Sequence, residues 1–294
     1  MTYESINELI VQATTERITI GELILKDQAE TMEITPEEVL ERMDSELTVM
    51  EESARLGMSK TIKSTSGLTG GDAYRLNEYN KVAGSLAGDF CNKAMTIAIA
   101  VAECNASMGR IVAAPTAGSC GILPAAILTM MQERGISRKQ ACLGLLSAGG
   151  VGMVIANVAS IAGATGGCQA ECGSAAAMAS AALVELSGGT PEMAGHAMAI
   201  SIKNQLGLVC DPVAGLVEVP CIKRNAGSIM CAIMAADLAL AGVKSVIPID
   251  EVISAMNEVG STLPCALRET AQGGLATTKT GLRLAEEILN PKMN

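Results

Sequence analysis

The chain is 294 residues long and 49% apolar, yet it contains one Phe, three Tyr and no Trp. This length and apolar content suit one or two globular domains, and they exclude a collagen, a small disulfide-stapled scaffold and a disordered chain. The net charge of -10 and the scarcity of rings argue against a nucleic-acid partner, because single-strand binding uses aromatic stacking and a basic groove.

Most of the acidity lies at the N-terminal end. Residues 1–60 carry 14 Asp/Glu and 5 Lys/Arg, whereas the rest of the chain carries 17 acids and 16 bases. We therefore predict a mainly α fold with an acidic helical N-terminal segment, residues 1–58, and a compact helical domain, residues 59–294. The polar, glycine-rich stretch near residue 60 is the best boundary, since no low-complexity linker occurs elsewhere.

Capping patterns mark the first helices. Ser5 followed by Glu8 forms a capping box before an apolar run. Thr35 is a stronger helix start, because Pro36 occupies the first helical position and Glu38 can reach back to the cap. These patterns predict helices through most of the N-terminal segment.

Further helices are predicted from runs of small apolar residues, mainly Ala and Gly, which let helix backbones approach closely. Asp250 is predicted to cap the last of these helices. The predicted helices cover residues 92–107, 124–134, 141–165, 174–186, 190–207 and 250–260.

Residues 140–170 form an uncharged run that is longer than the ~20 residues needed to span a bilayer. We interpret this run as core and expect no membrane partner, because seven glycines interrupt it and it has no Trp or Tyr belt. The first ten residues carry acids and no basic region, so no signal peptide is expected. The ten cysteines then indicate thiols or metal ligands in the cytoplasm rather than disulfides.

Two cysteine-bearing segments differ from the others because they are polar and rich in turn residues. One is GGCQAECG, with Cys168 and Cys172, and the other is VCDPVAGLVEVPCIKRN, with Cys210 and Cys221. Pro and Gly beside a thiolate fix the backbone and leave amides free to bind cluster sulfides. The spacing alone is a weak metal signal, since no CxxC occurs. Five other cysteines are interpreted as small buried hydrophobes: Cys91, Cys104, Cys142, Cys231 and Cys265.

Two glycine-rich loops, residues 63–72 and 114–121, could cradle an anion with backbone amides or could simply connect helices. Neither matches GxxxxGK[ST] or GxGxxG, so a nucleotide site lacks support. The only histidine, His196, stands in a predicted helix as a core or interface residue. A histidine-based triad and histidine-rich zinc chemistry are therefore disfavoured.

Four runs are long enough to identify a family: SGLTGGD at 66–72, ECNASMGRIVAAPTAGSCGILPA at 103–125, GGCQAECGSA at 166–175 and KNQLGLVCDPVAGLVEVPCIKRNA at 203–226. Together they closely resemble the α chain of iron–sulfur-dependent L-serine dehydratase. The similarity covers nearly the whole chain. It implies that residues 59–294 form a helical iron–sulfur catalytic domain.

The resemblance implies an oxygen-labile [4Fe–4S] cluster bound by three cysteines, which at the matching positions are Cys168, Cys210 and Cys221. It does not nominate Cys172, which stays an additional candidate. It also implies a separate β chain, because the Ser-Ser-Ser-His-Thr motif of the family's second domain is absent here. The chain would then be the α subunit of a heterodimer or a larger oligomer.

Three thiolate ligands would leave one iron open as a Lewis acid for the serine hydroxyl. The implied reaction is that of L-serine ammonia-lyase, a carbon–nitrogen lyase. Loss of water from L-serine gives aminoacrylate, which then yields pyruvate and ammonia. Such an enzyme would serve amino-acid catabolism and gluconeogenesis.

The substrate carboxylate is expected at the two glycine-rich loops. The predicted contacts are Ser66, Thr69, Gly70 and Gly71 in the first loop, and Thr116, Ala117, Gly118 and Ser119 in the second. Ser119 is a predicted catalytic residue because it adds a hydroxyl donor. Lys63 is the other predicted catalytic residue, as a candidate base. The base that removes the Cα proton is left open among Lys63, Lys203, Lys223, His196 and a residue of the partner chain.

Three other functions stay open. A pyridoxal-phosphate lyase would need a Schiff-base lysine, for which Lys63 beside the first loop is the only candidate. A non-catalytic electron-transfer or oxygen-sensing protein would bind every iron, with Cys172 as the fourth ligand. A related lyase could act on cysteine or another small amino acid, since the sequence does not fix the leaving group.

Overall fold

The computed structural model describes residues 3–290, which fold into α-helices and short helical turns without a β-strand. The prediction of a mainly α fold is confirmed. The helices are α1 (Ile6–Glu16), α2 (Ile20–Met32), α3 (Pro36–Gly57), α4 (Asp72–Ala83), α5 (Gly88–Ala106), α6 (Ile122–Arg134), α7 (Arg138–Val158), α8 (Gly163–Gly166), α9 (Ser174–Leu186), α10 (Pro191–Lys203), α11 (Cys221–Leu240), α12 (Ile249–Thr262) and α13 (Lys279–Leu289). The shorter turns are η1 (Gln169–Gly173), which is π-helical, and the 3₁₀ turns η2 (Val213–Gly215), η3 (Cys265–Leu267) and η4 (Gly274–Thr277).

Side-chain caps begin the first helices where the sequence predicts them. Ser5 Oγ accepts a hydrogen bond from Glu8 N over 3.1 Å at the start of α1. A complete capping box at Thr35 begins α3, with Pro36 in its first turn. The same device at Thr19 begins α2, a boundary that the sequence analysis did not mark. Local hydrogen bonding of this kind satisfies amides that have no partner inside the helix.

The prediction that Asp250 caps its own helix is wrong. Helix α12 begins at Ile249, and the Asp250 carboxylate instead accepts hydrogen bonds from Ile6 N (2.8 Å) and Asn7 N (3.0 Å) at the start of α1. Negative charge is favoured at a helix N-terminus, where unpaired amides point outward. Asp250 therefore ties the N-terminal segment to α12.

Two predicted helix ends also differ. The helix predicted over 141–165 ends at Val158, and the chain runs without regular structure to the separate short helix α8. The helix predicted over 190–207 ends at Lys203, four residues early. Both corrections shorten helices that precede the cysteine-bearing segments, so Cys168 lies beside the turn η1 and Cys210 lies in a loop.

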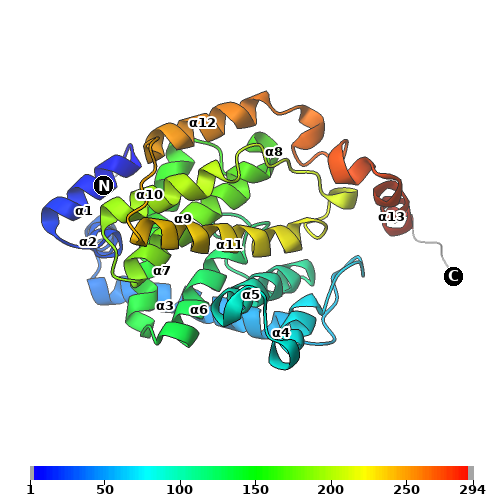
Figure 1. Cartoon of the computed structure of the whole chain (residues 1–294), viewed down its shortest axis with the longest axis horizontal. Helices are drawn as coiled ribbons and strands as arrows, with labels where there is room; N and C mark the ends of the chain where they lie inside the picture. Colours follow the sequence, from blue (N-terminus) through cyan, green and yellow to red (C-terminus); the bar gives the residue numbers. More distant parts are fainter. Residues whose placement is uncertain (1–2, 291–294) are drawn as a thin grey trace.

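One continuous hydrophobic core runs through both predicted parts of the chain. Ile6, Leu23 and Leu47 of the acidic segment are fully buried in the same cluster as Ile127 and Met198. Helix α9 lies in the middle of the molecule, with α1 at one end and α13 at the other (Figure 1). Helices α1–α3 thus pack as part of the main body, and a domain boundary after residue 58 stays a prediction.

Glycines at helix contacts let backbones come into direct contact. A Cβ on Gly21 of α2 would lie 2.3 Å from the carbonyl oxygen of Leu143 in α7. A Cβ on Gly57 of α3 would lie 1.8 Å from the carbonyl oxygen of Ala100 in α5. The prediction that small residues permit close approach of the helices is confirmed.

Among the described helices, α7 alone is long and apolar enough to cross a membrane by length and composition. However, 67% of its most apolar 18-residue window is buried inside the protein. The apolar surface of α7 is therefore used mainly in the core, as predicted for the uncharged run.

A candidate active site around three cysteines

The three predicted cluster ligands lie on separate segments, and all are buried. Cys168 precedes the turn η1, Cys210 lies in the loop after α10, and Cys221 is the first residue of α11. Cys172 Sγ lies 3.3 Å from Cys168 Sγ, and Cys210 is close enough to Cys168 to lower the pKa of that thiol. Burial and then the charge of Cys168 raise the pKa of the Cys221 thiol to about 12. The structure therefore brings the three cysteines together, with Cys172 beside them.

The donor set fits an iron–sulfur cluster. Hydrogen bonds from Cys172 and Cys210, with a smaller contribution from the Arg224 guanidinium, lower the pKa of Cys168 well below its usual range, whereas the contact with Cys168 and burial raise the pKa of Cys210. Thiolate sulfurs are the ligands of such clusters, so the fit rests on three cysteine side chains that share one buried site. Within residues 3–290, no group of three His, Cys, Asp or Glu side chains converges on a single metal ion. A [4Fe–4S] cluster does not require three side chains at one ion, because its thiolate ligands bind separate irons.

The segment between α12 and α13 holds Cys210 in place. Cys210 N donates to Leu267 O over 2.9 Å, and Glu269 N donates to Cys210 O over 2.7 Å. These bonds form an isolated parallel bridge between Cys210 and Arg268. The backbone on both sides of this sulfur is thus fixed by residues far along the chain.

Asn225 connects the second glycine-rich loop, residues 114–121, to α11. Its side-chain amide donates to Gly118 O over 2.7 Å and to Cys221 O over 3.0 Å. Its carbonyl oxygen accepts from Gly121 N over 2.9 Å. The loop predicted to bind the substrate carboxylate therefore lies against a predicted cluster ligand.

Glu171 joins the turn η1 to the same loop. Its carboxylate accepts a hydrogen bond from Thr116 Oγ1, which lies 3.0 Å from Ser119 Oγ. Ser119 is fully buried, whereas Ala117 is exposed. Burial raises the pKa of Glu171 to about 7. The predicted substrate hydroxyls of this loop lie at the cysteine site, and Thr116 already has a carboxylate partner.

The first glycine-rich loop is held by Glu218, which stands three residues before Cys221 and is buried. Ser66 Oγ and Thr69 Oγ1 donate to Glu218 Oε2 over 2.8 and 3.0 Å. Both predicted hydroxyls of this loop are therefore paired within the protein. Their role in binding substrate stays a prediction.

The turn of this loop requires its two glycines. Gly70 has φ 140° and Gly71 has φ 75°, in the region that side chains disfavour. A Cβ on Gly70 would also lie 2.2 Å from Ile62 O. Backbone geometry alone thus accounts for Gly70 and Gly71, and their predicted contact with substrate is a separate question.

The candidate bases lie in different surroundings. A lysine becomes a good base near neutral pH where burial lowers its pKa, but the side chains of Lys63 and Lys223 are exposed. Lys203 donates to Ser245 Oγ over 2.9 Å, and His196 Nδ1 accepts from Ser245 N over 3.3 Å, in the loop before α12. Desolvation within this chain therefore does not support Lys63 or Lys223, and the base stays open.

Glu171, Glu218 and Asn225 were not predicted as site residues, although each stands in one of the runs that identified the family. A signal was available, because Glu171 and Glu218 are isolated acids in apolar surroundings. A buried carboxylate needs hydrogen-bond donors, so such residues are expected to contact polar loops.

Gly163 has no side chain, and this leaves space between Cys210, Glu269 and Glu171. A Cβ there would lie 3.1 Å from Cys210 Sγ, 3.3 Å from Glu269 Oε2 and 3.4 Å from Glu171 Oε2. Gly163 is not among the residues with positive φ, so its backbone conformation does not require glycine. The space between the sulfur and the two carboxylates is therefore what a side chain would fill.

The remaining cysteines partly follow the prediction. Cys104 and Cys142 are buried, and Cys91 and Cys231 are half-buried. The prediction is wrong for Cys265, which lies exposed in the turn η3. Local apolar neighbours did not reveal that this part of the chain runs over the surface.

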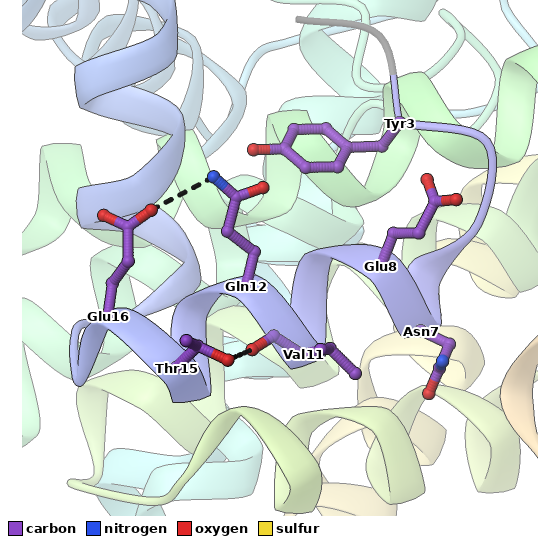
Figure 2. A pocket seen from close by; sticks show the side chains of 7 residues that line it. All are labelled: Tyr3, Asn7, Glu8, Val11, Gln12, Thr15 and Glu16. Carbon is purple, nitrogen blue, oxygen red and sulfur yellow. Dashed lines mark hydrogen bonds between the residues drawn. The ribbon is translucent and has the colours of Figure 1, made fainter.

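A cavity of about 550 Å³ beside α1 contains none of these residues. It is lined by Tyr3 and by α1 side chains from Asn7 to Glu16, with Gln12 Nε2 donating to Glu16 Oε1 over 3.1 Å (Figure 2). It holds no cysteine and no predicted site residue. Cavity size therefore does not identify the candidate active site.

Similarity to known proteins places the chain in a class of lyase subunits. The family described as serine dehydratase alpha chain matches residues 15–276, and the chain belongs to that family. The resemblance inferred from the sequence runs is confirmed.

Two α chains match over nearly their full length. The probable L-serine dehydratase, alpha chain, of Bacillus subtilis is 49% identical over 286 residues, which cover 97% of this chain and 95% of the relative. The L-serine dehydratase, alpha chain, of Peptoniphilus asaccharolyticus is 48% identical over 281 residues, covering 95% and 96%. L-serine dehydratase 1 of Escherichia coli is 45% identical over 182 residues, covering 61% of this chain and 40% of the relative.

Proposed function

We propose that this chain is the α subunit of an L-serine dehydratase, which converts L-serine to pyruvate and ammonia. The α chains that match it along nearly their whole length carry this name. The observation that carries the proposal is the meeting of Cys168, Cys210 and Cys221 in one buried site, with a glycine-rich loop tied to that site by Asn225.

A separate β chain is part of the proposal. The relatives named as α chains are covered almost completely by this chain, whereas L-serine dehydratase 1 and L-serine dehydratase TdcG of Escherichia coli are covered over 40% of their length. The unmatched part of the longer relatives supports a second chain that completes the enzyme here. We also propose a cytoplasmic enzyme, which is supported by ten free thiols.

Cys168, Cys210 and Cys221 would hold a [4Fe–4S] cluster. Such a cluster with three protein ligands supplies an open iron, a Lewis acid for a hydroxyl leaving group. The chain's own residues orient the substrate: backbone amides of the two glycine-rich loops and the Ser119 hydroxyl would bind the carboxylate. Glu171 keeps Thr116 of the second loop in place.

Removal of the Cα proton needs a base. Lys63 is exposed in this chain, so it could act as a base only if another surface buried it and lowered its pKa. The β chain could provide that surface or could supply the base itself. A pyridoxal-phosphate lyase depends on the same lysine, and its activity would survive iron chelation but not borohydride.

The proposal is tested by anaerobic reconstitution with iron and sulfide, with and without a β chain, followed by a pyruvate assay. We expect visible cluster absorbance that bleaches in air, and pyruvate from L-serine. L-cysteine and L-threonine, assayed in parallel, report the preferred leaving group. A reconstituted cluster with no lyase activity in the two-chain protein would contradict the proposal.

One observation favours a second candidate, a non-catalytic cluster protein with four cysteine ligands. Cys172 is buried and its Sγ lies 3.3 Å from that of Cys168. This candidate requires Cys172 for cluster binding, whereas the dehydratase requires an open iron.

Ser119→Ala should raise the KM for L-serine about tenfold, the effect of losing one hydrogen bond to the substrate carboxylate. The kcat should change less, because the hydroxyl is assigned to binding. Ser180→Ala in α9 is the matched control, since Ser180 is equally buried but donates to Ala177 O within its own helix. An unchanged KM for Ser119→Ala rules out the assigned contact.

Gly163→Ala should reduce the cluster content about tenfold, because the added methyl crowds the Cys210 sulfur and the two neighbouring carboxylates. The measurement is iron and sulfide bound per chain after reconstitution, with thermal unfolding as a check of folding. Gly227→Ala on α11 is the control, because a Cβ there meets nothing within 4 Å. Full cluster content in Gly163→Ala would show that the cluster lies elsewhere.

A further inference from the structure

Glu269 is an acidic residue of the site that the proposed function does not use. It lies between α12 and α13, and its N–H donates to Cys210 O over 2.7 Å. Its φ is 62°, a left-handed backbone conformation that is uncommon outside glycine. Such a conformation persists where surrounding contacts hold it, and here the bridge to the Cys210 segment does so.

The Glu269 carboxylate faces the centre of the site. Its Oε2 lies 3.3 Å from the position that a Cβ on Gly163 would take, which is also 3.1 Å from Cys210 Sγ and 3.4 Å from Glu171 Oε2. No hydrogen bond or ion pair between residues 3 and 290 uses this carboxylate. Glu269 therefore offers an unpaired acceptor beside a predicted cluster ligand.

The nearest arginines on these segments have other partners. Arg224 pairs with Asp211 over 2.8 Å and donates to Val209 O over 2.7 Å. Arg268, the neighbour of Glu269, donates to Thr165 O over 3.4 Å. Neither arginine forms an ion pair with Glu269, so its negative charge is available to a bound cation.

L-serine brings a cation to this site. The proposed function assigns the substrate carboxylate to the loops and the hydroxyl to the open iron, and it leaves the ammonium group without a partner. A carboxylate binds an ammonium group through short, charge-assisted hydrogen bonds. We propose that Glu269 binds the ammonium group of L-serine and thereby selects amino acids over hydroxy acids. This inference rests on the proposed function.

The test compares Glu269→Gln with the unchanged protein, each reconstituted with iron and sulfide and combined with a β chain. We expect the KM for L-serine to rise about 10- to 100-fold, because the Gln amide keeps an acceptor oxygen but loses the negative charge that pairs with the ammonium group. The inhibition constant of 3-hydroxypropanoate, which is serine without its amino group, should stay within about twofold. Visible absorbance should show equal cluster content in both proteins, and calorimetry of L-serine binding should repeat the shift.

Two further variants sharpen the test. Glu269→Asp retains the charge on a shorter side chain and should give a KM between those of the unchanged protein and Glu269→Gln. Glu258→Gln, an exposed acid of α12 whose side chain contacts nothing in the site, should leave all constants unchanged.

The possible outcomes separate the inference from the function on which it rests. An unchanged KM in Glu269→Gln, or an equal rise in the KM and in the inhibition constant of the amino-free analogue, overturns the inference alone. No pyruvate from L-serine with the unchanged two-chain protein overturns the proposed function and the inference together.

Discussion

Replacing Cys168, Cys210 or Cys221 by Ala is expected to abolish cluster binding and lyase activity together. Each thiolate would bind a different iron, so the loss of one leaves a cluster with two protein ligands and an exposed edge. We expect bound iron and sulfide, and pyruvate formation from L-serine, to fall at least about a hundredfold. The measurements are iron and sulfide content, visible absorbance and the pyruvate assay on the anaerobically reconstituted two-chain protein.

Other buried cysteines provide the matched control. Cys142→Ala in α7 removes a thiol of similar burial, and it should lower the free energy of unfolding by about 1 kcal/mol while leaving the cluster intact. Equal loss of the cluster in both sets would contradict the assignment. Cys172→Ala decides between the two candidate functions: retention of cluster and activity favours the open-iron dehydratase, and loss of the cluster favours four cysteine ligands.

The helix starts at Ser5 and Thr35 were predictable because their signals are local. Thr35 and Glu38 form reciprocal hydrogen bonds and stand only three residues apart, so a short stretch of sequence contains both partners. Asp250 was misassigned for the opposite reason. Its partner Ile6 N lies 244 residues away in the chain, and only the packing of α12 against α1 brings them together.

The site shows the same difference between signals that the sequence contains locally and contacts that only the fold creates. The three cysteines were nominated by sequence runs that resemble a family, and the structure places them in one buried site. The residues that position the loops were not nominated, because their contacts span the chain: Glu218 meets Ser66 across 152 residues, and Glu171 meets Thr116 across 55. A buried acid indicates that a polar partner exists, but its identity depends on the tertiary fold.

Gly57→Ala should be among the most destabilising single substitutions outside the site. The new Cβ would lie 1.8 Å from Ala100 O and 2.7 Å from Ala100 Cα, so α3 and α5 would have to move apart along their contact. The overlap is with backbone, which cannot move aside as a side-chain tip can. We expect the free energy of unfolding to fall by about 3 kcal/mol or more, and the midpoint temperature by about 5–10 °C.

The direction of this effect is informative because Gly→Ala inside a helix ordinarily stabilises a protein by about 0.4–1 kcal/mol. Gly149→Ala in α7, where a Cβ would meet nothing within 4 Å, should show that ordinary gain. Calorimetry of the two variants thus separates close packing from helix propensity. If Gly57→Ala unfolds at the same temperature as the unchanged chain, α3 and α5 have room to separate freely.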